Sequence, residues 1–166
     1  GISHEAIGLA GHLGLSKLIV LYDSNNISID GSLDLSDSTN QSKRFEASGW
    51  STIEIDGHDH SQIEEAIAKE LKTDTPSLIV CKTTIGYGSP DKAGTSASHG
   101  APLNQEEIDN MRDNLQWNHA PFEIPTDIKD AWRLVGLKNT SKRKDWEERQ
   151  SKIDDKKKVK FLHAIN

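Results

Sequence analysis

Three short, apolar, β-branched runs limit the fold of this chain more than any other feature of its sequence. They cover residues 17–22, 51–55 and 77–82, and each has the length and composition of a buried strand. A segment with helical periodicity lies before each run. Because strands that alternate with helices pair in parallel through right-handed crossovers, the sequence predicts an α/β fold with three parallel strands and flanking helices.

The helical segments that precede the strands cover residues 3–15, 41–48 and 61–71. Ser61 and Glu64 have the spacing of a capping box, so the third helix is expected to begin at Ser61. An apolar stripe on this helix is expected to face the core. The stripe consists of Ile63, Ala66, Ile67 and Leu71.

Further helical segments follow the third strand. Asn104 and Glu107 again have the spacing of cap residues, which predicts a helix that begins at Asn104. From Lys138 onward the chain is dense in Lys, Asp and Glu, which is typical of a solvated helix or a linker. We therefore expect one domain at residues 1–137, followed by a charged helical segment at residues 138–166.

Charge and cysteine content exclude several classes of function. The formal net charge is −6, and half of the 20 basic residues lie in residues 138–160, so nucleic acid is not an expected partner. No apolar run approaches the roughly 20 residues that cross a bilayer, and the first residues lack a secretory signal, so we expect a cytoplasmic protein with no membrane partner. The single cysteine, Cys81, is expected to be buried in the third strand and offers no disulfide framework.

The loop that follows the first strand begins Asn25-Asn26-Ile27. In parallel sheets, the loops at the carboxyl ends of the strands carry the ligand chemistry. An asparagine there can offer its amide oxygen to a hard cation, and loop carbonyls can complete an oxygen shell that suits magnesium bound to phosphates. Two asparagines after a strand are also common in ordinary turns, so both interpretations remain open at this point.

The loop after the third strand, residues 83–103, is long and rich in glycine. Such a loop in a compact domain is usually functional or disordered, and its apolar residues argue against disorder. His99 lies between Ser98 and Gly100 and could reach a phosphate or a substrate oxygen. A loop histidine can equally be structural.

Two more histidines occur in the run Gly57-His58-Asp59-His60, which could be taken for a metal site. The run lies directly before the predicted third helix. This position indicates a helix-entry loop, in which the imidazoles need no ligand role.

Seven short segments follow one another along the chain and together are far more specific than one glycine-rich loop. They are residues 1–6, 25–31, 44–50, 55–59, 85–90, 98–103 and 120–125. From residue 1 to about residue 132, the chain resembles transketolase in these motifs and in their order.

The resemblance implies thiamine diphosphate as cofactor, with Mg²⁺, or Ca²⁺ or Mn²⁺ in its place, as the bound metal. Asn25 would supply a side-chain oxygen to the metal, and Ile27 would supply its backbone carbonyl. Ile85 and Gly86 match the loop that packs beside the cofactor. His99 matches a catalytic histidine of the family that contacts the cofactor's diphosphate and the donor substrate.

Other matches concern the ends of the chain and the dimer. Glu5 matches a glutamate at the family's dimer interface, although an acidic residue near a helix start is also favoured by the helix dipole. The family's cofactor motif begins Gly-Asp-Gly, and Gly1 would fall just after it, so we expect both ends to be truncations and the chain alone to be inactive. Asn26 stands where glycine is common, and Ser96 stands where many members have a second histidine.

The implied activity is transfer of a two-carbon ketol unit from a ketose phosphate to an aldose phosphate in the pentose phosphate pathway, by a homodimer. Dihydroxyacetone synthase shares most of these motifs and is the main alternative. Deoxyxylulose phosphate synthase and the E1 subunits of dehydrogenases are further thiamine enzymes to consider. A non-catalytic module that binds the cofactor or dimerises is an alternative of a different class.

Overall fold

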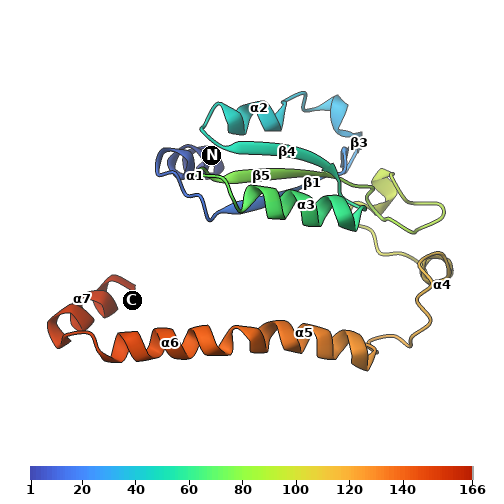
Figure 1. Ribbon diagram of the computed structural model, residues 1–166. Helices are drawn as coiled ribbons and strands as arrows, with labels where there is room; N and C mark the ends of the chain where they lie inside the picture. Colours follow the sequence, from blue (N-terminus) through green and yellow to red (C-terminus); the bar gives the residue numbers. More distant parts are fainter. Residues whose placement is uncertain (166) are drawn as a thin grey trace. The chain divides into compact units, whose positions relative to one another are not determined.

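The computed structural model describes residues 1–165, and the chain divides into two compact units between Trp117 and Asn118. The first unit contains a sheet of three parallel strands in the order β1-β5-β4 (Figure 1). The strands are β1 Ile19–Ser24, β4 Ser51–Asp56 and β5 Ser77–Lys82. The three predicted strands and their parallel arrangement are therefore confirmed.

Helices α1 Ile2–His12 and α2 Gln41–Glu46 cover one face of this sheet, and α3 His60–Glu70 covers the other. Helix α4 Gln105–Asn114 follows the loop after β5. A two-stranded hairpin, β2 Ile27–Ser28 with β3 Gly31–Ser32, follows β1. Two 3-10 turns, η1 Leu33–Leu35 and η2 Ser96–Ser98, lie in the loops.

Alternate residues of β5 point to opposite layers of the core. Leu78 and Val80 pack with Trp50 and with residues of α1 and α2 on one face. Ile79 and Cys81 pack against α3 on the other face, so Cys81 is a buried strand residue as predicted. Figure 1 shows α2 and α3 on opposite sides of the sheet.

Trp50 connects α1 and α2 on the first face of the sheet. Its indole Nε1 donates a hydrogen bond of 3.0 Å to the carbonyl of Ile7 in α1. Its ring meets Phe45 of α2 edge to face, with centroids 5.0 Å apart. Gly11 allows α1 to approach closely, because a Cβ at this position would collide with the carbonyl of Ser48.

The start of α3 differs from the prediction. Asp59 is the N-cap, and its Oδ1 accepts hydrogen bonds from the backbone N–H of Ser61 at 2.9 Å and of Gln62 at 3.2 Å. The prediction of Ser61 as the cap was wrong because the Asp59 carboxylate satisfies two free helix donors at once. Residues 57–59 form a helix-entry loop, as predicted, and His60 is the first residue of α3.

The start of α4 agrees with the prediction. Asn104 is the N-cap, and its side chain accepts a hydrogen bond of 2.8 Å from the N–H of Glu107.

The predicted stripe on α3 is correct for Ile63, Ala66 and Ile67, which pack against the sheet. It is wrong for Leu71, which caps the helix and is 65% exposed. Glu70 is buried instead, at 1% exposure, and neither of its carboxylate oxygens has a hydrogen-bond partner.

The second unit consists of α5 Thr126–Lys138, α6 Thr140–Ser151 and α7 Asp155–Ile165. Two ion pairs between residues four positions apart stabilise α6. Arg143 pairs with Glu147 at 2.9 Å, and Lys152, the C-cap, pairs with Glu148 at 2.6 Å. The predicted charged segment is thus helical, while the predicted domain boundary at residues 137 and 138 stays a prediction.

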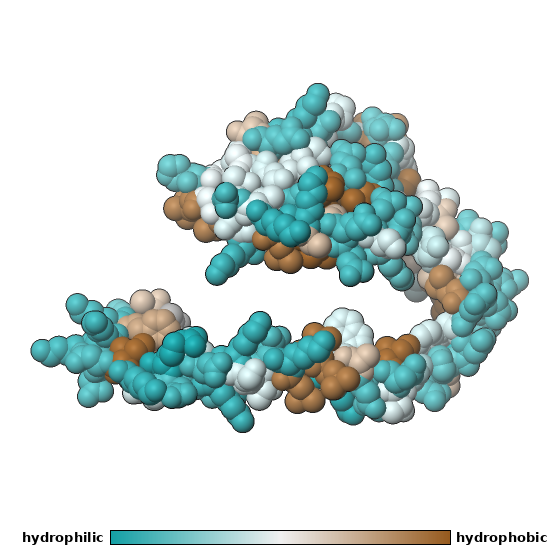
Figure 2. All heavy atoms as spheres, viewed as in Figure 1, coloured by the Kyte–Doolittle hydropathy of each residue, from teal (hydrophilic) through white to brown (hydrophobic). Residues whose placement is uncertain are grey.

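Apolar side chains gather on α5 of this unit (Figure 2). Those more than a third exposed are Ile128, Trp132, Leu134, Val135 and Leu137. In the part of the chain that the structure describes, no helix is both long and apolar enough to cross a membrane.

We predict that Glu70→Met raises the free energy of unfolding of the chain by about 1 to 3 kcal/mol, because it removes a buried carboxyl group without partners. Urea denaturation followed by circular dichroism measures the change. Glu65→Met, at an exposed position of the same helix, is the matched control and should change stability little. A loss of stability in Glu70→Met would show that Glu70 is needed in the core.

Candidate active-site segment

The carboxyl ends of the strands meet at one edge of the sheet. Ser24, the last residue of β1, lies opposite Lys82, the last residue of β5. Asn25 and Thr83 therefore leave neighbouring strands side by side. The N–H of Thr83 donates to the carbonyl of Ser24 at 3.3 Å, and the Thr83 hydroxyl donates to the carboxylate of Asp23. The two loops with predicted chemistry are thus joined at their first residues.

Asn25 begins a tight turn. Its Oδ1 accepts a hydrogen bond of 3.0 Å from the N–H of Ile27. Asn26 has a left-handed backbone with φ of 58°, a conformation that asparagine and glycine adopt more readily than other residues. The carbonyl of Asn26 accepts the N–H of Leu33 at 2.9 Å, which fixes the far side of the turn. Asparagine therefore fits the position where glycine was expected.

The donor groups of this turn suit a hard cation. An amide oxygen has two lone pairs, so Oδ1 of Asn25 can contact a metal while it accepts the N–H of Ile27. Amide and carbonyl oxygens are ligands that Mg²⁺ and Ca²⁺ accept. Among the described residues, no group of three or more His, Cys, Asp and Glu side chains is placed to hold a metal ion. Asn25 and Ile27 can provide one side of an oxygen shell.

A polar hollow of about 330 Å³ lies at the same edge, along Ser24, Asn26 and Lys82. Lys82 forms an ion pair of 2.9 Å with Glu54, and Ser42 donates to the same carboxylate at 3.0 Å. Both hydrogen bonds hold the pKa of Glu54 below its ordinary value, and the bond from Lys82 has the larger effect. The other residues that line the hollow are Tyr22, Leu33, Asp34, Asp37, Ser38, Thr39, Asn40, Gln41 and Val80.

The loop after β5 folds back on itself around Gly86. Gly86 has a φ of 65°, and a Cβ there would lie 2.6 Å from Oγ of Ser98. That Oγ donates to the carbonyl of Lys92 at 2.5 Å, and the carbonyl of Ile85 accepts the N–H of Gly94 at 2.8 Å. Ile85 and Gly86 are therefore packed against the segment that carries His99.

His99 is exposed at the end of this folded loop. Its backbone N–H donates to the carbonyl of Ser96 at 3.0 Å, which fixes the backbone of His99. Gly100 has a φ of 131°, and a Cβ there would meet nothing within 4 Å. The imidazole is thus next to open space, as a residue that contacts a ligand must be.

The sequence predicted Glu107 only as a cap residue of α4, and the contacts of its carboxylate with the β5 loop were not predicted. Glu107 is 5% exposed, and its carboxylate accepts hydrogen bonds from the hydroxyl of Ser89 and, at 3.2 Å, from the N–H of Asp91. The Ser89 hydroxyl is the main cause that holds the pKa of Glu107 below its ordinary value. Glu107 fastens the loop of Gly86 to the first turn of α4.

Glu5 lies in the first turn of α1, and its side chain is exposed. It does not belong to the loops at the carboxyl edge of the sheet. Its predicted place at a dimer interface stays a prediction.

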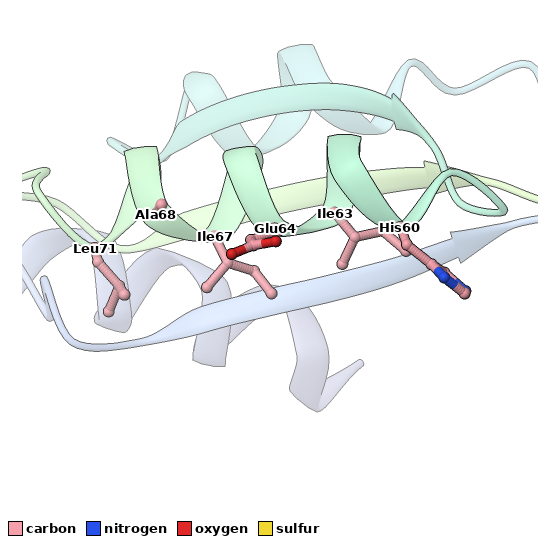
Figure 3. Close-up of a pocket in the computed structure, with 6 residues that line it drawn as sticks. All are labelled: His60, Ile63, Glu64, Ile67, Ala68 and Leu71. Carbon is pink, nitrogen blue, oxygen red and sulfur yellow. The ribbon is translucent and has the colours of Figure 1, made fainter.

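A second hollow, of about 430 Å³, runs along one side of α3 (Figure 3). Ile63, Ile67 and Leu71 line it, and Figure 3 shows them along one side of the helix. It contains none of the predicted site residues and few polar groups, so it does not have the chemistry of a phosphate or metal site.

Comparison with known proteins decides the family. A family model described as "Transketolase, thiamine diphosphate binding domain" matches residues 1–163. The chain belongs to this transketolase family. The resemblance inferred from seven short segments is therefore confirmed.

Individual transketolases agree with this assignment. The transketolase of Rhodobacter capsulatus is 48% identical over 161 residues, which are 97% of this chain and 24% of that protein. The crystal structure of the Campylobacter jejuni transketolase has a TM-score of 0.86 and 37% identity, over 98% of this chain and 26% of its own. A Pichia stipitis transketolase in complex with sedoheptulose 7-phosphate has a TM-score of 0.83 and 34% identity, over 91% and 23%. The chain thus spans about a quarter of the length of these transketolases.

We predict that Glu107→Gln changes how the thermal stability of the chain depends on pH. A carboxylate whose folded pKa is lowered stabilises the fold above its unfolded pKa, and this contribution disappears as pH falls through the folded pKa. The melting temperature of the unmodified chain should therefore fall more steeply than that of Glu107→Gln below about pH 4.5.

Circular dichroism melts from about pH 7 to about pH 3 measure this difference. Glu106→Gln, at an exposed neighbouring position, is the control and should follow the unmodified chain. Parallel curves for the unmodified chain and Glu107→Gln would contradict the role given to this carboxylate.

Proposed function

We propose that the chain forms part of the cofactor and donor-substrate site of a transketolase. Such an enzyme transfers a two-carbon ketol unit from a ketose phosphate to an aldose phosphate. The observation that carries the proposal is the family match, which extends over residues 1–163. The oxygen donors and the exposed imidazole at the carboxyl edge of the sheet support it.

Asn25 and Ile27 hold Mg²⁺ through the side-chain amide oxygen and the backbone carbonyl. The turn that places them next to each other and the chemistry of both donors support this assignment. Ile85 and Gly86 pack beside thiamine diphosphate. When bound, this cofactor supplies the chemistry that breaks and forms the carbon–carbon bond.

His99 contacts the diphosphate of the cofactor and the donor sugar. Its exposure and the open space at Gly100 support this role, because a ligand can approach the imidazole without a change of the loop. Imidazole can both donate and accept hydrogen bonds, so His99 can bind a phosphate oxygen and a sugar hydroxyl.

The substrates are ketose and aldose phosphates. The Pichia stipitis structure contains sedoheptulose 7-phosphate, a ketose phosphate, and its likeness to this chain supports the same substrate class here. The protein acts as a homodimer in the cytoplasm, with Glu5 at the interface between subunits.

Assay of the complete gene product tests the function as a whole. With xylulose 5-phosphate as donor, a transketolase uses ribose 5-phosphate as acceptor, whereas a dihydroxyacetone synthase uses formaldehyde. We expect turnover with ribose 5-phosphate that depends on thiamine diphosphate and Mg²⁺. Turnover with formaldehyde alone would favour the alternative enzyme, and no turnover with either acceptor would favour a non-catalytic module.

We predict that Asn25→Ala in the complete gene product weakens Mg²⁺-dependent binding of thiamine diphosphate, because one oxygen ligand is lost. Excess Mg²⁺ should partly restore binding. Titration with thiamine diphosphate at several Mg²⁺ concentrations, followed by intrinsic fluorescence, measures the effect.

Asn25→Asp is the matched variant, since a carboxylate oxygen can both bind the metal and accept the N–H of Ile27. It should bind the cofactor better than Asn25→Ala. An unchanged Mg²⁺ dependence in Asn25→Ala would rule out the ligand role.

We predict that His99→Ala in the complete gene product lowers kcat/KM for the donor ketose by about 10- to 150-fold, the loss expected for one hydrogen bond to a charged group. Thermal stability should hardly change, because His99 is exposed and supports little of the core. Steady-state kinetics and thermal melts measure the two effects.

His60→Ala serves as the control, because His60 is also exposed but lies at the start of α3. Its kinetics should match those of the unmodified enzyme. Normal donor kinetics in His99→Ala, or failure of this variant to fold, would assign His99 a structural role.

A further inference from the structure

His58 connects two loops that are distant in the sequence. It lies between β4 and α3, half-buried, and its ring contacts the loop that leaves β5. The Nε2 atom of His58 lies 2.8 Å from the backbone N of Thr84. The ring also stacks on Tyr87, with centroids 3.9 Å apart and an angle of 18° between the planes.

The backbone around His58 fixes the position of its ring. The N–H of Gly57 donates to the carbonyl of Lys82 at 2.8 Å, so the β4 loop lies directly against the end of β5. A Cβ at Gly57 would be only 2.5 Å from Cγ2 of Thr83, so glycine permits this approach. The N–H of His58 donates to Oδ1 of Asp56 at 2.9 Å, which holds the residue from the other side.

The contact with Thr84 determines the tautomer of His58. A backbone N–H can only donate a hydrogen bond, so Nε2 must be the acceptor. The ring proton is then on Nδ1, and the imidazole is neutral. A doubly protonated ring could not accept the N–H of Thr84.

Thr84 directly precedes Ile85 and Gly86, the residues that we placed beside the cofactor. On the β1 side, the preceding residue Thr83 is bound to Asp23 and Ser24. On the β4 side, His58 binds Thr84. The entry to the cofactor loop is therefore held from both neighbouring strands.

We infer that His58 is a positioning residue, which holds the Ile85–Gly86 segment in place for the cofactor through Thr84 and Tyr87. It acts as the neutral tautomer with the proton on Nδ1. The stack on Tyr87 supports the same loop one turn further along. The effect of His58 on cofactor binding rests on the proposed function. The contact between the two loops is independent of that function.

The first experiment measures the contact itself in the 166-residue chain. Nitrogen-15 NMR of the His58 ring should give an unprotonated Nε2 and a protonated Nδ1. Hydrogen exchange at the Thr84 amide should become about 3- to 10-fold faster in His58→Phe, which keeps the stacked ring and removes the acceptor. His58→Gln places an amide oxygen near the position of Nε2 and should restore much of the protection.

The second experiment measures the consequence in the complete gene product. In His58→Phe, the Kd for thiamine diphosphate at fixed Mg²⁺ should rise by about 3- to 10-fold. At saturating cofactor, kcat should change much less, because the role inferred for His58 is exerted through Thr84 and Tyr87. His58→Gln should again recover most of the loss, and His60→Phe, at an exposed position outside this contact, should match the unmodified protein.

Three results would overturn the inference. They are a proton on Nε2 in the unmodified chain, unchanged Thr84 exchange in His58→Phe, and a cofactor Kd that is equal in His58→Phe and the unmodified protein. The NMR result holds even if His58→Phe does not fold. If the unmodified gene product binds no thiamine diphosphate, the proposed function fails, and the Thr84 exchange still decides whether His58 positions the loop.

Discussion

The burial of β5 is the constraint on which the rest of the first unit depends. All residues from Ser77 to Cys81 are buried, and the strand pairs with both β1 and β4. Because Ser24 and Asp56 both lie opposite Lys82, the three strands end at the same level. This common level brings the turn of Asn25, the entry to the β5 loop and the His58 loop to one edge, where parallel sheets bind ligands.

Polar contacts between loops fix the segments that the sheet brings to its carboxyl edge. The Thr83 hydroxyl reaches Asp23, the Thr84 amide reaches His58, and the Glu107 carboxylate reaches Ser89. Each contact joins segments that are distant in the sequence and fixes a stretch with little secondary structure. The folded loop around Gly86 thus obtains a defined shape without strands or long helices of its own.

Local patterns were sufficient to predict much of this architecture from the sequence. The three strands and the Asn104 cap follow from periodicity and cap spacing, which act within one element. The burial of the Glu70 and Glu107 carboxylates could not be predicted, because tertiary packing buries both charged helix residues, Glu70 without partners and Glu107 with Ser89. The contact of His58 with Thr84 likewise depends on two strands being placed side by side, which no local pattern encodes.

The order of the strands has a consequence for how this unit is made. β5 comes last of the three along the chain but lies between the other two, and within the described residues β1 and β4 are not neighbours in the sheet. Neither strand can pair within this sheet until β5 is available, so the sheet depends on long-range contacts, which form slowly. During synthesis on the ribosome, the turn of Asn25 emerges well before β5, the strand that pairs with β1 and so positions this turn. The carboxyl edge of the sheet can therefore form only after β5 has been synthesised.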